Sequence, residues 1–295
     1  MNSWKRLLSI TLLACACELS AHAAAPTFSF KVDNVTTVQV ERTDAKHITL
    51  RMVPGGKIQQ LDIDAPDTSD QESLEAADYN FDGYKDLAIS VPVGMVNSSY
   101  QIYLYEPATS RFVALAQPAE KIPAANCDDL SEIKLKPADH VLISSCRSGP
   151  AWYTDAYRYR ADGRLYLYQT DRLLSDDDVL AVLKGGKNQR AANSDPSLFV
   201  ITYDEHGQVI AESIQDYEGD MHSNRQGDRV TITVGADRLP LYEDTSEQPT
   251  RRYLVKGDVA EVVDVNELWL KINYHRPQKG VVSGWVKATD IGAQP

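Results

Sequence analysis

Short segments of alternating or continuous apolar residues, rich in β-branched and aromatic side chains, recur along most of the chain. This pattern is typical of strands, because successive side chains of a strand point to opposite faces of a sheet. The clearest examples are residues 36–42, 47–53, 87–91, 100–105 and 141–146. The sequence therefore predicts a mostly β protein.

Two further segments, residues 157–168 and 199–210, predict tight hairpins. In each, a turn that contains glycine separates two strands of aromatic and β-branched residues, as a tight hairpin requires. One short helix is predicted after Ser175, which can cap it. The acidic residues 176–178 suit the positive N-terminal end of this helix, and Gly185 ends it.

Successive hairpins over about 200 residues favour a β-propeller with degenerate blades of about 40 residues each, and a β-sandwich is the alternative. We expect this domain to cover residues 27–215. The polar stretch 216–228 contains glycines and charges but few apolar residues, which is typical of a linker. Five short strands follow in a compact run over residues 229–293. The predicted fold is all-β, with two domains.

The N-terminus carries the pattern of a secretion signal. Two basic residues precede an apolar stretch at 7–17, which is shorter than the ~20 residues of a membrane span. A small-x-small cleavage site follows at 21–23, so we expect residues 1–23 to be a signal peptide. The alternative is a lipobox, in which Cys15 is lipidated. Both interpretations predict a periplasmic protein, and we expect no transmembrane segment.

The charge of the chain limits its partners. The net charge is −12, and without residues 1–23 the chain has 28 basic and 41 acidic residues. Because cations are needed to bind nucleic acid and anionic lipid, the sequence predicts neither partner. An acidic surface would attract a cationic partner over a long range.

Only Cys127 and Cys146 remain outside the predicted signal peptide. An even pair of cysteines in an oxidising compartment predicts a disulfide between them.

The strongest motif is a possible calcium loop that starts at residue 78. Oxygen-bearing side chains occupy loop positions 1, 3, 5 and 9, and Gly83 occupies position 6, where the chain must turn sharply. A backbone carbonyl would come from position 7. Position 12 is Ile89 in place of the usual Glu, so we expect modest affinity, about 10⁻⁴–10⁻³ M. The alternative is an Asx-rich turn without metal. The predicted ligands of this EF-hand-like loop are Asp78, Asn80, Asp82, Tyr84 and Asp86.

A second candidate site lies between two strand signals, directly after Cys146. It contains a Ser-Gly-Pro turn, and it has the residue types that dominate binding hot spots. The alternative is that its aromatic residues belong to the core or to its rim. The predicted partner-binding residues are Arg147, Ser148, Gly149, Trp152 and Tyr153.

Together, the leader, the segment 80–87, the hairpin 103–112 and the Arg-Ser-Gly loop resemble one family. It comprises the periplasmic immunity proteins of the bacteria-killing type IV secretion system, which inhibit peptidoglycan-cleaving effectors and lysozymes. The resemblance covers residues 27–215 and implies a five-bladed propeller with a calcium loop on its rim. It also implies that Ser148, Gly149 and Tyr153 are inhibitory, with the Tyr entering the hydrolase cleft. Trp152 stands where the Tyr is expected.

Residues 229–293 resemble bacterial SH3-like domains in the spacing of four segments, 238–242, 253–258, 268–272 and 284–288. This resemblance implies cell-wall or peptide binding in some members. From the residues alone, we favour core positions for Trp269 and Trp285, because a barrel of this size has little other core.

No Gly-x-Ser-x-Gly, His-Glu-x-x-His or other catalytic constellation is present, so we expect a binding protein and not an enzyme. Two functions follow. The first is an immunity protein that inserts a loop into a peptidoglycan hydrolase or lysozyme and inhibits it. The second is a calcium-stabilised envelope protein that binds cell wall or a partner through the SH3-like domain and inhibits nothing.

Overall fold

The computed structural model of the chain describes residues 28–63, 72–116, 125–149, 151–184, 196–217, 224–246 and 248–292. The predicted signal peptide, residues 1–23, and the lipobox cysteine Cys15 lie outside these residues. The all-β prediction is confirmed, because the described residues form β-strands with one α-helix. Within these residues, no helix has the length and apolar character that crossing a membrane requires.

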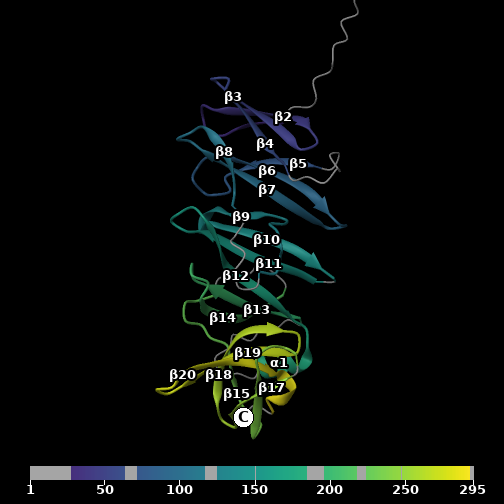
Figure 1. Ribbon diagram of the computed structural model, residues 1–295, viewed down its shortest axis with the longest axis vertical. Helices are drawn as coiled ribbons and strands as arrows, with labels where there is room; N and C mark the ends of the chain where they lie inside the picture. The colour runs from purple at the N-terminus through teal and green to yellow at the C-terminus, as the bar shows by residue number, and fades with distance from the viewer. Residues whose placement is uncertain are drawn as a thin grey trace, which may run out of the picture.

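Two four-stranded antiparallel sheets come first in the chain (Figure 1). In both, the strands are neighbours in chain order, because each short polar turn leads directly into a hairpin. The first sheet contains β1 (Phe28–Lys31), β2 (Thr37–Asp44), β3 (His47–Val53) and β4 (Ile58–Asp62). The second contains β5 (Ser73–Ala77), β6 (Asp86–Val93), β7 (Asn97–Glu106) and β8 (Arg111–Ala114).

The third sheet is antiparallel and six-stranded, again in chain order. Both predicted hairpins lie in it and are confirmed, and all residues of β13 are buried. Its strands are β9 (Lys134–Lys136), β10 (Val141–Ser148), β11 (Ala151–Tyr159), β12 (Leu165–Leu174), β13 (Ser197–Tyr203) and β14 (Val209–Asp216), and the 3₁₀ helix η2 (Pro137–Asp139) joins β9 to β10.

The predicted helix follows β12 and is confirmed as α1 (Asp177–Lys184). Its cap is one residue later than expected. Asp176 Oδ1 accepts the backbone N–H groups of Asp178 (3.0 Å) and Val179 (3.1 Å), so this carboxylate performs the role assigned to the Ser175 hydroxyl.

The fourth sheet has the order β15-β18-β19-β20-β16-β17, so its connections are less local than those of the other three. The 3₁₀ helix η3 (Ala288–Asp290) follows its last strand. The strands are β15 (Thr231–Thr233), β16 (Arg238–Tyr242), β17 (Pro249–Val255), β18 (Val259–Asn266), β19 (Trp269–Arg276) and β20 (Gly280–Lys287).

The four sheets succeed one another along the longest axis of the molecule, in chain order (Figure 1). The region 27–215, for which about five blades are expected, has three sheets among its described residues. The described strands do not close into a barrel.

Two hydrophobic cores connect the sheets. One is shared by the first two sheets and includes Ile48, Leu87 and Ile89. The other contains Ala88 and extends through the third sheet and α1 to the C-terminal sheet, ending at Ile291. Because Leu87, Ala88 and Ile89 are consecutive in β6, the second sheet contributes to both cores through its two faces.

The predicted linker, residues 216–228, begins inside the third sheet, because Asp216 is the last residue of β14. Its described residues 224–228 are bonded to the same sheet. Asn224 Nδ2 donates to the carbonyl of Val200 (3.0 Å), and the Glu212 N–H donates to the carbonyl of Asp228 (3.0 Å). Residues 218–223 lie outside the described residues. The entry into the C-terminal sheet is therefore held against β14.

Candidate functional site

The predicted calcium loop connects β5 to β6 in the second sheet. Two of its residues have left-handed backbone conformations, Phe81 (φ 62°) and Gly83 (φ 92°). This conformation is favourable for glycine but uncommon for a bulky side chain such as that of Phe81. Strain of this kind is kept where the surrounding structure over-determines it, which marks the loop as a candidate site.

The side-chain oxygens of the first three predicted ligands lie close together. The Asp78 carboxylate accepts the N–H groups of Asp82 (3.0 Å) and Gly83 (2.9 Å). Asn80 Oδ1 accepts the same Asp82 N–H at 3.3 Å, and Asp82 Oδ1 accepts the Tyr84 N–H at 2.9 Å. The backbone thus wraps around Asp78, Asn80 and Asp82, as the motif predicts.

Asp86 has a different position. It is fully buried, and its two oxygens accept the N–H groups of Tyr79 and Tyr105, both at 2.8 Å. The pKa of Asp86 is raised to about 7, mainly by burial and in smaller part by the charges of Asp82 and Asp78, while the two backbone hydrogen bonds lower it. Its carboxylate therefore anchors the loop to β7. The ring of Tyr84, the predicted carbonyl ligand, lies tilted against that of Tyr105, with the centroids 5.8 Å apart and 44° between the planes.

The donor set of the loop fits a hard cation. Carboxylate, amide and carbonyl oxygens suit calcium and not the softer transition metals. Within the part of the chain that the structure describes, no group of three or more His, Cys, Asp or Glu side chains is arranged to hold a metal ion. Asp86 is engaged by backbone amides, so Asp78, Asn80 and Asp82 are the loop side chains that would hold calcium.

A tyrosine from the third sheet completes the surroundings of the loop. Tyr159 Oη is buried without a hydrogen-bond partner. Burial raises the pKa of Tyr159, and the charges of Asp86, Asp78 and Asp82 raise it further, which puts the hydroxyl within electrostatic range of the loop. An unsatisfied hydroxyl beside a set of hard oxygens is consistent with a bound ion or its water at this place.

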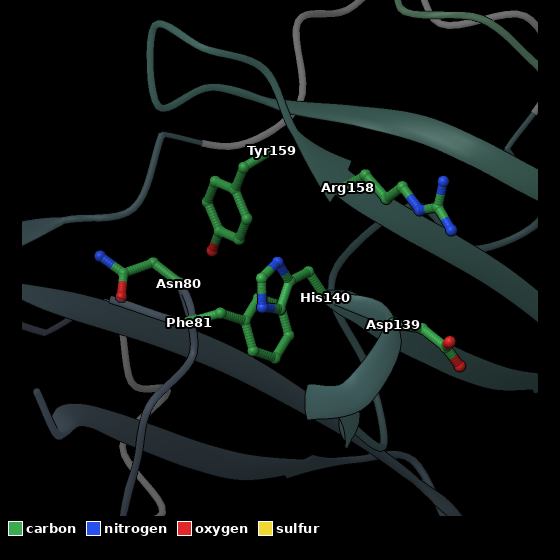
Figure 2. A pocket seen from close by; sticks show the side chains of 6 residues that line it. All are labelled: Asn80, Phe81, Asp139, His140, Arg158 and Tyr159. Carbon is green, nitrogen blue, oxygen red and sulfur yellow. The ribbon is translucent and has the colours of Figure 1, made fainter. Parts of the chain in front are cut away.

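A cavity of about 360 Å³ separates the loop from the third sheet (Figure 2). The Phe81 ring stacks on His140 (5.4 Å between centroids, 16° between planes) and meets Tyr159 edge-on at 6.4 Å. Figure 2 shows the Tyr159 hydroxyl directed into this space, whereas Arg158 and Asp139 point away from it. Neither His140 nor Tyr159 is predicted from the sequence, because no local pattern relates them to a loop about 60 to 80 residues earlier.

The second candidate site is the end of the β10–β11 hairpin. Arg147 pairs with Trp152, Cys146 pairs with Tyr153, and Ser148 pairs with Ala151. Arg147, Ser148 and Gly149 are exposed, and Trp152 is 40% exposed, whereas Tyr153 is half-buried. Pro150 lies outside the described residues. All five predicted partner-binding residues lie at this hairpin end. Because cross-strand partners share a face and successive residues alternate, Arg147 and Trp152 lie on one face, and Tyr153 lies on the opposite face with Cys146.

Two links hold this hairpin end in place. The predicted disulfide between Cys127 and Cys146 is confirmed, with 5.7 Å between the Cα atoms. The side chain of Asn97, from β7 of the second sheet, forms two bonds with the backbone of Arg147. Its Oδ1 accepts the Arg147 N–H (2.8 Å), and its Nδ2 donates to the Arg147 carbonyl (3.1 Å). Sequence reasoning did not identify Asn97.

The tryptophans of the C-terminal sheet have structural surroundings. Trp269 is buried and meets Tyr242 edge-on at 4.8 Å, as expected for a core position. Trp285 is half-buried, with the Lys271 ammonium 5.8 Å from its ring. Neither ring lies open on the surface as a binding platform would.

Comparison of the chain with protein-family models, with curated proteins and with solved structures found no match.

Proposed function

We propose that this protein is an exported, calcium-binding immunity protein that inhibits a peptidoglycan hydrolase of the lysozyme or muramidase type. The observation that carries the proposal is the β10–β11 hairpin end, where Arg147, Trp152 and their neighbours are exposed and fixed by the disulfide and by Asn97. Exposed Arg and Trp side chains on a rigid support are typical of binding hot spots.

The chemistry of the hairpin end suits a glycosidase cleft. Such clefts contain two carboxyl groups on either side of the scissile bond. The Arg147 guanidinium would pair with the ionised carboxylate, whereas Tyr153, on the opposite face of the hairpin with Cys146, would point away from it. The Trp152 ring would occupy a sugar subsite. Inhibition then requires no catalytic group of this chain.

Calcium has a structural role in this proposal. Asp78, Asn80 and Asp82 would hold the ion, and Tyr159 would face it from the third sheet. The ion would neutralise the two clustered carboxylates and so keep Phe81 in its left-handed conformation against His140. Resemblance to the immunity family supports a propeller-like arrangement of the first three sheets, and the separate resemblance to bacterial SH3-like domains supports an SH3-like C-terminal sheet.

The test is a cell-wall lysis assay with the purified mature protein in calcium, a cationic c-type lysozyme and a bacterial muramidase. We expect inhibition that falls at least tenfold on Arg147→Ala or Trp152→Ala. Val281→Ser, an exposed change on the C-terminal sheet, should leave inhibition unchanged. Full hydrolase activity, together with retention on insoluble peptidoglycan that is lost on Trp285→Ala, would contradict the proposal and favour a cell-wall binder.

Calcium binding has a separate readout. A calorimetric titration should show heat with the wild type and none with Asp82→Ala. Equal heats from both proteins would contradict calcium binding by this loop, but they would not affect the proposed inhibitory role of the β10–β11 hairpin.

A further inference from the structure

The turn between β6 and β7 has an unusual surface. Met95 is 98% exposed, Val93 is 50% exposed and Val96 is 45% exposed. Single exposed apolar residues are common on folded proteins, but three in four consecutive positions at a hairpin end are a contiguous patch. The Val93–Asn97 pair closes this hairpin, so the apolar side chains lie at its end.

This turn lies beside the proposed inhibitory hairpin. Asn97, the first residue of β7 after this turn, holds both backbone polar groups of Arg147. In Figure 1, the hairpins β6–β7 and β10–β11 end on the same side of the molecule. The Met95–Val96 turn and the Arg147–Trp152 hairpin end therefore lie side by side on neighbouring sheets.

The two hairpin ends are fixed relative to one another by a connecting segment. The Tyr100 N–H donates to the Leu130 carbonyl, and the Ser145 N–H donates to the Ser131 carbonyl, both at 2.8 Å. The segment is also attached to β10 through the Cys127–Cys146 disulfide. A surface that is ordered before binding loses little conformational entropy when it binds.

Acidic side chains flank this apolar surface. Asp128 and Asp129 are exposed, and they follow Cys127 directly in the connecting segment. A carboxylate rim around an apolar centre resembles the anatomy of specific interfaces and selects a positively charged partner. The net charge of −12 also favours a positively charged partner.

We propose that the ends of the β6–β7 and β10–β11 hairpins form one two-pronged docking surface for a cationic protein with a concave cleft. The inference rests on the proposed function, in which that protein is the hydrolase, and adds a second prong, Met95 and Val96, to the Arg147 hairpin. Two projecting ends match a concave partner better than a flat one. A second copy of this chain is disfavoured, because each copy would bring the same acidic rim to the interface.

The test measures the kinetics of binding to immobilised cationic c-type lysozyme, and also to the same lysozyme after succinylation, which reverses its charge. Met95→Ser and Val96→Asn should each weaken affinity at least fivefold, through faster dissociation. The double change Asp128→Asn with Asp129→Asn should slow association severalfold and reduce its dependence on salt, with little change in dissociation. Val35→Ser, a matched change at a 72% exposed valine before β2, should have no effect.

Each failure points to a different conclusion. If Met95→Ser and Val96→Asn bind like the wild type while Trp152→Ala does not, the second prong is wrong and the proposed function stands. If Val35→Ser weakens binding as much as Met95→Ser, or succinylated lysozyme binds equally well, the surface is not specific and the inference is wrong. If the wild type neither binds nor inhibits lysozyme, the proposed function fails for this hydrolase, and the docking surface fails with it.

Discussion

Gly83 and Gly257 have nearly the same backbone conformation, with φ values of 92° and 91°, and nothing lies within 4 Å of a Cβ added at either position. Replacement of either glycine by Ala should therefore lower the free energy of unfolding by a similar amount, about 1 kcal/mol, because of the left-handed conformation alone. Only Gly83 belongs to the calcium loop. In thermal melts, Gly83→Ala should reduce the stabilisation by 5 mM calcium over chelator, whereas Gly257→Ala should leave it intact. Equal calcium stabilisation in both variants would disprove this role for the loop.

Glu212 gives a prediction for pH dependence. It is buried in β14, with its Oε2 3.8 Å from Arg229 Nε. Burial raises the pKa of Glu212 to about 7. Arg229 lowers it, and Glu261 of β18 raises it. The unfolded chain therefore loses this proton near pH 4 and the folded chain near pH 7, so the contribution of Glu212 to stability falls as pH rises across that interval.

Glu212→Gln removes this titration. The difference in melting temperature between pH 5 and pH 8 should become smaller by several °C, since about 1 kcal/mol corresponds to 2–4 °C in a chain of this size. The exposed Glu243 is the control, and Glu243→Gln should keep the wild-type profile. A Glu212→Gln profile parallel to that of the wild type would show that this group does not titrate as stated.

At the scale of elements, local chemistry made much of the structure predictable. The alternating strands, the glycine hairpins within 157–168 and 199–210, the short helix and the Cys127–Cys146 bridge all follow from neighbouring residues. The number of sheets could not be predicted from these local patterns. A hairpin pattern shows that two strands pair, but it does not show where pairing stops. In the third sheet it continues through six strands.

The same limit applies to the sites. The sequence identifies the loop residues Asp78, Asn80 and Asp82, which are close in the chain. It does not identify Tyr159 beside that loop or Asn97 beside Arg147, because these contacts join separate sheets. It also could not show that Asp86 is engaged by the amides of Tyr79 and Tyr105, since β7 supplies one of them.

The disulfide allows a prediction about the hairpin as an element. Replacement of Cys127 and Cys146 by Ser should cost about 3 kcal/mol, because the bridge restricts a loop of this length in the unfolded chain. Urea unfolding of the variant, and of the wild type with and without reductant, measures this cost. The reduced wild type should match the double variant. If lysozyme affinity then remained at the wild-type value, rigidity of the hairpin would not be the source of binding.

The cores join the four sheets into one folded unit at the scale of the whole molecule. Leu183 of α1, Phe199 of β13, Val262 of β18 and Ile291 belong to the same buried cluster. Arg172 of β12 also bonds to Asp264 of β18, with 3.2 Å between Nε and Oδ1. An independent C-terminal domain on a free linker would share neither feature. Deletion of residues 229–292 would therefore expose part of the core of the third sheet.

A single cooperative transition should follow from this shared core, because separating the sheets would expose apolar surface on both sides. The tryptophans make the test direct, since outside the predicted signal peptide Trp152 lies in the third sheet and Trp269 and Trp285 lie in the fourth. The variant Trp152→Phe keeps the two tryptophans of the fourth sheet, so its fluorescence reports on that sheet. The double variant Trp269→Phe with Trp285→Phe keeps Trp152, so its fluorescence reports on the third sheet. In urea, the fluorescence midpoint of each variant should coincide with its own circular dichroism midpoint. A fluorescence midpoint displaced from the circular dichroism midpoint in either variant would mean that the C-terminal sheet unfolds separately, despite its common core with β13 and α1.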